Sequence, residues 1–147
     1  MESLEIQILL VEDNMNDAEL TIRALSRNNI TNKVIHLKDG AIAIDFLFGK
    51  GEFKDRDVIQ KPKVILLDLK MPKMDGIEVL AVIKADELTK NIPVVMLTSS
   101  REHPDIERAY SLGANSYIVK PVEFDSFSKA IAELGFYWLL LNHPPIK

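Results

Sequence analysis

The chain has 147 residues, a length typical of one domain, and its 47% hydrophobic and 27% charged residues are ordinary for a soluble globular protein. Its 18 basic and 22 acidic residues leave a net charge of -4, which argues against a nucleic-acid-binding protein. Cysteine is absent, which excludes disulfides, thiolate metal sites and a cysteine nucleophile. The first residues carry no basic secretory region, and no apolar stretch reaches the roughly 20 residues of a membrane helix. We therefore expect a cytoplasmic protein.

Apolar runs of strand length alternate with segments of helical period along the chain. The predicted strands are residues 6–11, 33–37, 64–67, 94–97 and 117–119. The runs at 6–11, 64–67 and 94–97 are nearly continuous in Val, Ile, Leu and Met, which is typical of strands covered on both faces. These three are expected to be central, and the other two to lie further out.

Five helices are expected between and after these strands. The first begins after Asn14 or Asn16 and carries an apolar stripe at helical spacing, formed by Met15, Ala18, Ile22 and Leu25. The second begins at 39–40 and ends at Gly49, the third follows 75–76, the fourth covers about 104–112, and the fifth begins near Glu123. A polar connection at 50–61 is longer than usual, and it is either a functional loop or an idle surface loop.

This alternation predicts an α/β fold, namely a doubly wound parallel sheet of the flavodoxin-like type with five strands in the order 2-1-3-4-5. Ligands of such sheets bind beyond the carboxyl ends of the strands, where strands one and three meet. We expect residues 1–147 to form one domain.

Polar residues follow four of the predicted strands. Glu12 and Asp13 follow the first, Asp68 the third, Thr98 the fourth, and Lys120-Pro121 the fifth. Each is an ordinary strand-ending residue when taken alone, but their joint placement at one edge is improbable by chance. Crowded carboxylates either raise a pKa or bind a divalent cation, and Mg2+ prefers such oxygen ligands.

With a cation bound, the Asp68 carboxylate could act as a nucleophile toward a phosphoryl group. Lys120 and the Thr98 hydroxyl are suited to hold the phosphoryl oxygens. An acidic residue further on, Asp17, fits the first turn of the first helix, where the helix dipole favours negative charge.

The chain resembles the receiver domains of two-component response regulators. The similarity rests on VEDN at 11–14, LLDLKMPKMDG at 66–76, LTSS at 97–100 and YIVKP at 117–121. It implies that Asp68 accepts phosphate from a sensor histidine kinase and that Mg2+ is required. It also implies metal binding by Glu12, Asp13, Asp68 and the Lys70 backbone carbonyl.

The same resemblance implies that Thr98 and Tyr117 rearrange on phosphorylation, that Lys120 contacts the phosphoryl group, and that Pro121 follows a cis peptide bond. Lys70 and Ser100, each two residues beyond a site residue, would flank the phosphoryl group. Tyr117 could instead simply pack on its strand.

The chain ends at Lys147 soon after the fifth helix, so we expect a stand-alone receiver without an output domain, similar to the regulators partnered with phytochromes. Its last turns carry the surplus apolar residues Phe136, Tyr137, Leu139 and Leu140, which either pack over the domain itself or form a contact surface. We predict a homodimer through this carboxyl-terminal part. No nucleic-acid or membrane partner is expected.

Two other functions are alternatives to that of a phosphoacceptor. A phosphate-independent adaptor would retain only the fold, and the complete set of site residues argues against it. A hydrolase working through an aspartyl phosphate would need an acid two residues after Asp68, where Lys70 stands. Nucleotide-binding glycine motifs are absent. We therefore expect no enzymatic activity beyond acceptance and loss of the protein's own phosphoryl group.

Overall fold

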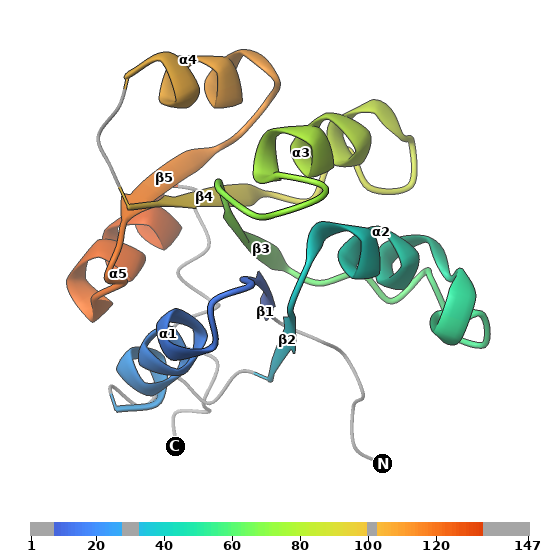
Figure 1. Ribbon diagram of the computed structural model, residues 1–147, viewed down its shortest axis with the longest axis horizontal. Helices are drawn as coiled ribbons and strands as arrows, with labels where there is room; N and C mark the ends of the chain where they lie inside the picture. Colours follow the sequence, from blue (N-terminus) through green and yellow to red (C-terminus); the bar gives the residue numbers. More distant parts are fainter. Residues whose placement is uncertain (1–7, 28–32, 100–102, 134–147) are drawn as a thin grey trace, which may run out of the picture.

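The computed structural model describes residues 8–27, 33–99 and 103–133, and it places five parallel strands in one sheet (Figure 1). The strands are β1 (Ile8–Val11), β2 (Val34–Leu37), β3 (Val64–Asp68), β4 (Val94–Thr98) and β5 (Ser116–Val119). The helices are α1 (Met15–Arg27), α2 (Gly40–Phe48), α3 (Gly76–Ala85), α4 (His103–Ser111) and α5 (Phe124–Glu133), with a short 3-10 helix η1 (Gly51–Phe53). The strand order β2-β1-β3-β4-β5 confirms the predicted fold.

Helices cover both faces of the sheet. Alternate strand residues, such as Leu9 and Leu67, pack with α2, α3 and α4 in one hydrophobic cluster. Their neighbours Leu10 and Leu66 pack with α1 and α5 in the other. Figure 1 shows α1 and α5 together on one side of the sheet and α2 and α3 on the other. Burial on both faces explains why the central strands are nearly continuous in apolar residues.

The helices begin at polar caps that follow the strand ends. The Asn14 side chain accepts a hydrogen bond from the Asp17 N–H (2.9 Å), so Asn14 rather than Asn16 caps α1. Asp39 caps α2, and Asp75 forms a reciprocal capping box with Glu78 at the start of α3. These caps start the helices close to the edge where the site lies.

The predicted apolar stripe of α1 is wrong at Met15, whose side chain is 63% exposed. The buried residues of this helix include Ala18, Thr21 and Leu25. At about 100° per residue, Met15 lies beside Ile22 at the border of this face rather than in its middle. The buried face therefore includes a threonine that the apolar pattern passed over, and its middle lies near Leu25.

The long connection at 50–61 is attached to α2. The Arg56 guanidinium lies 3.9 Å from the centroid of the Phe46 ring, and its Nη1 donates a hydrogen bond to the Phe46 carbonyl (2.9 Å). Cation–π contact and hydrogen bonding hold this segment against the end of the helix.

The predicted carboxyl-terminal contact surface lies outside the described residues, because α5 is described only as far as Glu133. The homodimer therefore stays a prediction.

Candidate functional site

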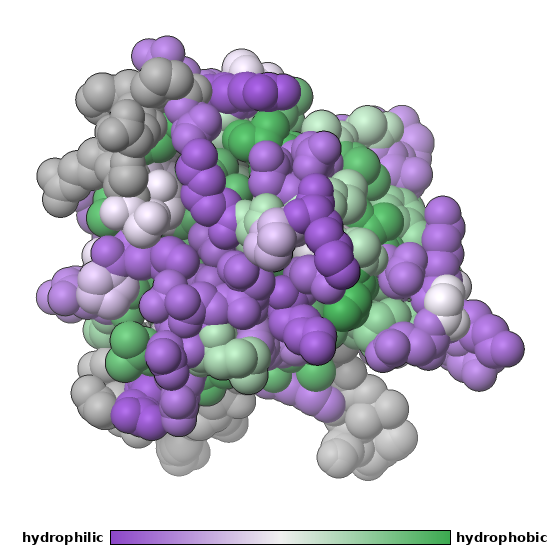
Figure 2. Space-filling model, in the orientation of Figure 1, coloured by the Kyte–Doolittle hydropathy of each residue, from purple (hydrophilic) through white to green (hydrophobic). Residues whose placement is uncertain are grey.

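The register of the parallel strands gathers the predicted site residues at one edge of the sheet. Val11 pairs with Leu67, so Glu12 and Asp68 follow at the same level. Asp68 pairs with Leu97 and Thr98 with Val119, which places Lys120 just beyond. In the orientation of Figure 1, hydrophilic residues cover the middle of the surface that faces the viewer (Figure 2).

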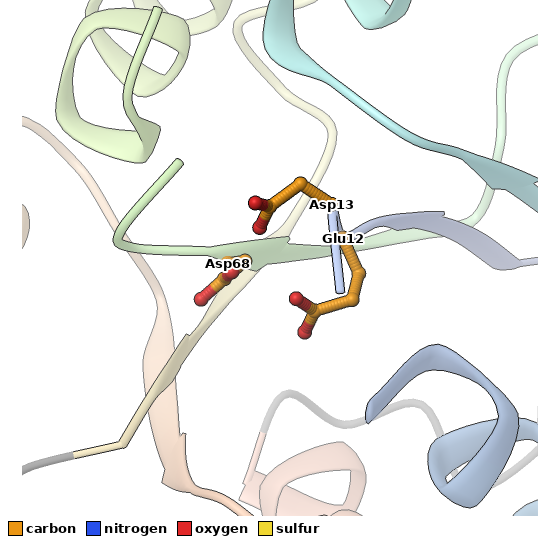
Figure 3. Close-up of side chains that lie close together, drawn as sticks. All are labelled: Glu12, Asp13 and Asp68. Atoms are coloured by element: carbon orange, nitrogen blue, oxygen red, sulfur yellow. The ribbon is translucent and has the colours of Figure 1, made fainter. Parts of the chain in front are cut away.

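Three carboxylates form the centre of this edge. One oxygen each of Glu12, Asp13 and Asp68 lies within 4.8 Å of the others, and Figure 3 shows the three groups around a common space. Glu12 and Asp68 are buried, whereas Asp13 is more exposed. Glu12 is fixed by the Asn14 N–H, which donates to its Oε2 (3.1 Å). Hard oxygen ligands in this number suit a divalent cation such as Mg2+.

Lys120 lies among the same acids. Its Nζ is 3.1 Å from Glu12 Oε1 and 3.4 Å from Asp68 Oδ1. Its main-chain N–H donates to the Thr98 carbonyl (2.7 Å), and its peptide bond to Pro121 is cis. The ammonium is thereby held next to Asp68, the carboxylate that is predicted to be the acceptor.

Asp17 is a member of the site that sequence reasoning missed. It does lie in the first turn of α1, but its Oδ2 is also 2.9 Å from Lys120 Nζ. The sequence signal that could have identified Asp17 is its position in the first turn of a helix that starts at the edge of the site. His36 contacts the backbone of this edge, since its Nε2 donates a hydrogen bond to the main-chain oxygen of Glu12 (2.8 Å).

Burial and the neighbouring Glu12 raise the pKa of Asp68 to about 7, although Lys120 acts in the opposite direction. Burial alone would lower the pKa of Lys120, but the hydrogen bond to Asp17 and the charges of Asp68 and Glu12 outweigh it and raise that pKa. One ammonium thus faces several carboxyl groups at this edge, and a divalent cation would relieve the repulsion between them.

This raised pKa predicts how the stability of the metal-free protein depends on pH. The folded protein holds the Asp68 proton up to a pH of about 7, whereas an unfolded aspartate loses it near 3.8, so stability falls as pH rises between these values. In a chelating buffer at pH 8, we expect Asp68→Asn to raise the free energy of unfolding by about 1–3 kcal/mol. Urea unfolding at pH 8 and pH 4 measures the free energy of unfolding of the variant and the wild type. An equal gain in stability at both pH values would contradict the prediction.

Thr98 and Tyr117 lie on neighbouring strands and share a small cavity of about 10 Å³ that is also lined by Ile106 and Ala109 of α4. Thr98 is buried, and the half-buried Tyr117 ring meets Tyr110 edge to face, with centroids 6.2 Å apart. The site thus adjoins a small space beneath α4.

The Lys70 ammonium pairs with an acid of α4 that lies outside the Glu12, Asp13 and Asp68 cluster. Its Nζ lies 3.3 Å from Asp105 Oδ2 in the first turn of α4, and its side chain is largely exposed. The second predicted flanking residue, Ser100, lies outside the described residues.

A doubly wound sheet with three carboxylates, a hydroxyl and an ammonium at its carboxyl edge has the chemistry of a cation- and phosphoryl-binding protein. The model of the response regulator receiver domain family matches residues 8–132, and the chain belongs to this family.

Two similar curated proteins cover most of the chain. The probable methanogenesis regulatory protein FilR2 of Methanothrix harundinacea is 42% identical over 94% of this chain and 86% of its own length. Response regulator Rcp1 of Synechocystis is 39% identical over 90% of this chain and 88% of its own length. The chain is thus a response regulator receiver of two-component signalling.

Solved structures agree with this assignment. The bacteriophytochrome response regulator AtBRR is 50% identical with a TM-score of 0.85, covering 96% of this chain and all of that one. The Mn(2+)-bound form of Rcp1 has 39% identity and a TM-score of 0.72, with 90% and 93% covered. Phosphorylated RcpA, a cyanobacterial phytochrome response regulator, has 36% identity and a TM-score of 0.73, with 95% and 96% covered.

Among the described residues, no helix has the length and apolar character needed to span a membrane.

Proposed function

We propose that the protein accepts a phosphoryl group on Asp68 from a sensor histidine kinase, in a reaction that requires Mg2+. The observation that supports this most is the meeting of Glu12, Asp13 and Asp68 around one space with the Lys120 ammonium beside them. A buried carboxylate next to a cation site and a fixed ammonium has the groups that phosphoryl transfer needs.

In the proposed step, an Asp68 carboxylate oxygen attacks the phosphorus of a phosphohistidine. The new O–P bond forms as the P–N bond breaks, and the electron pair returns to the imidazole nitrogen, which takes up a proton. The Lys120 ammonium and the Thr98 hydroxyl stabilise negative charge on the transferred oxygens. A divalent cation held by Glu12, Asp13, Asp68 and the Lys70 backbone carbonyl would supply positive charge that offsets repulsion between the carboxylates and the incoming phosphoryl group.

Relatives support the finer parts of this proposal. One similar structure is a Mn(2+)-bound form and another is a phosphorylated phytochrome response regulator. We therefore propose a phytochrome-type kinase as the phosphoryl donor. We also propose the cytoplasm as the location, as expected from the sequence. The chain covers most of the length of AtBRR, Rcp1 and FilR2, and we propose that residues 1–147 form a single receiver domain. The homodimer through the carboxyl-terminal part belongs to the same proposal.

The proposed output surface is the face formed by α4, β5 and α5. A groove of about 700 Å³ lies there, lined among others by Tyr110, Tyr117, Lys129 and Glu133. Because Tyr117 lines both this groove and the small cavity beside Thr98, a rearrangement at Thr98 can alter the groove. Phosphorylation would shift the balance between two states of this face, and partner binding would follow that balance.

The proposed function is tested by incubating the protein with acetyl phosphate. We expect a mass increase of one phosphoryl group when Mg2+ is present and none in a chelating buffer, with the modified peptide containing Asp68. Failure to take up phosphate under both conditions would favour the phosphate-independent adaptor. Multiple turnover of a phosphate ester would instead indicate a hydrolase.

A further inference from the structure

Lys120 is shared unequally among three carboxylates. Its Nζ is 2.9 Å from Asp17, 3.1 Å from Glu12 and 3.4 Å from Asp68, so the shortest of the three contacts is to the residue on α1. A lysine ammonium has three N–H donors, and these three acids can occupy all of them. A phosphoryl group on Asp68 would have to draw the ammonium away from at least one of them.

The three acids would be destabilised to different degrees if the Lys120 ammonium moved away. The side chains of Glu12 and Asp68 are 0% and 4% exposed, so either charge would remain buried without its partner. The Asp17 side chain is 36% exposed, and water can solvate its carboxylate once the ammonium leaves. Asp17 is therefore the partner that releases Lys120 most easily.

We propose that Asp17 is a positioning residue that competes with a phosphoryl group on Asp68 for the Lys120 ammonium, and so weakens retention of that group. This inference rests on the proposed function. The ion pair with Asp17 stabilises the unphosphorylated arrangement, and the same pair is given up when Lys120 turns to the phosphoryl oxygens. A second effect has the same sign, because the Asp17 carboxylate repels an anionic group at the site.

The pKa of Lys120 agrees with this picture. Among the contacts that raise it, the hydrogen bond to Asp17 has the largest effect, ahead of the charges of Asp68 and Glu12. The most exposed of the three acids is thus in direct hydrogen-bond contact with the ammonium.

The test measures the affinity of the protein for beryllofluoride, a phosphoryl analogue, in the presence of Mg2+ by calorimetry. We expect Asp17→Asn to bind it about threefold to tenfold more tightly than the wild type, because a partly exposed ion pair no longer has to be broken. Asp17→Ser, which also suits a helix start, provides a second variant without the charge and should change affinity in the same direction.

Two controls separate this role from a general effect of charge or folding. Glu19→Gln removes a negative charge from the same helix, where Glu19 pairs with Arg23 at 2.9 Å, and should leave the affinity unchanged. Asp17→Glu retains the charge, so any gain in affinity should be smaller than that of Asp17→Asn.

Equal or weaker binding by both Asp17→Asn and Asp17→Ser would overturn the inference, as would equal tightening by Glu19→Gln. A wild type that neither binds beryllofluoride nor takes up phosphate from acetyl phosphate would instead overturn the proposed function. A wild type that takes up phosphate at Asp68, with Asp17 variants unchanged, would overturn the role of Asp17 alone.

Discussion

Asp68→Asn is expected to lower the rate of phosphoryl uptake from acetyl phosphate by about 100-fold or more, because the amide removes the attacking carboxylate oxygen. Asparagine has nearly the same shape, so the side chain can occupy the same buried position at the end of β3. Time-resolved intact-mass measurement with saturating Mg2+ gives the rate for the variant and the wild type.

A matched control shows whether the loss reflects chemistry or folding. Asp105→Asn removes an acid of the same type from α4, where its carboxylate pairs with Lys70 outside the carboxylate cluster. It should retain an uptake rate within about threefold of the wild type, since exposed ion pairs contribute little. Uptake by Asp68→Asn at the wild-type rate would place the acceptor at another residue.

Gly76→Ala is expected to destabilise the protein by about 3 kcal/mol, at the upper end of the range for overpacked sites. A Cβ at Gly76 would collide with the main-chain oxygen of Asp68 and would lie 2.9 Å from the Leu69 Cα. Both are backbone atoms, so no side-chain rotation can relieve the contact. The start of α3 and the loop after β3 would have to move apart.

Urea unfolding measures this loss, and phosphoryl uptake provides a second readout. Because the displaced loop begins at Asp68, the uptake rate should fall as well, even under conditions where the variant is folded. Val82→Ala on the same helix is the control, since that side chain is 37% exposed and its truncation should cost little. A Gly76→Ala protein as stable as the wild type would show that α3 can start without this close approach.

The fold and the main site were predictable because each rests on a local pattern. Continuous apolar runs indicated buried parallel strands, and parallel strands bring the residues after their carboxyl ends together whatever lies between them. Glu12, Asp68 and Lys120 could therefore be grouped although up to 108 positions separate them. The sequence alone does not distinguish Asn14 from Asn16 as the cap of α1, because both have the same capping chemistry.

The features that the sequence did not predict depend on how helices, strands and loops are placed relative to one another and on which of their side chains meet. Asp17 contacts Lys120 only because the long Lys120 side chain, which follows β5, reaches the first turn of α1, a relation that helical periodicity does not contain. The burial of Thr21 in place of Met15 follows from the rotation of α1 against the sheet, which one apolar stripe does not fix. The contact of Lys70 with Asp105 likewise needs the position of α4 relative to the loop after β3.

The Lys70–Asp105 ion pair links the loop that follows Asp68 directly to α4. Lys70, two residues beyond Asp68, is tied to the first turn of α4 by a pair whose side chains are 73% and 37% exposed. Such an exposed ion pair contributes little to stability, and dissolved salt screens the attraction between its charges. We therefore expect this direct link between the loop after β3 and α4 to weaken as the salt concentration rises.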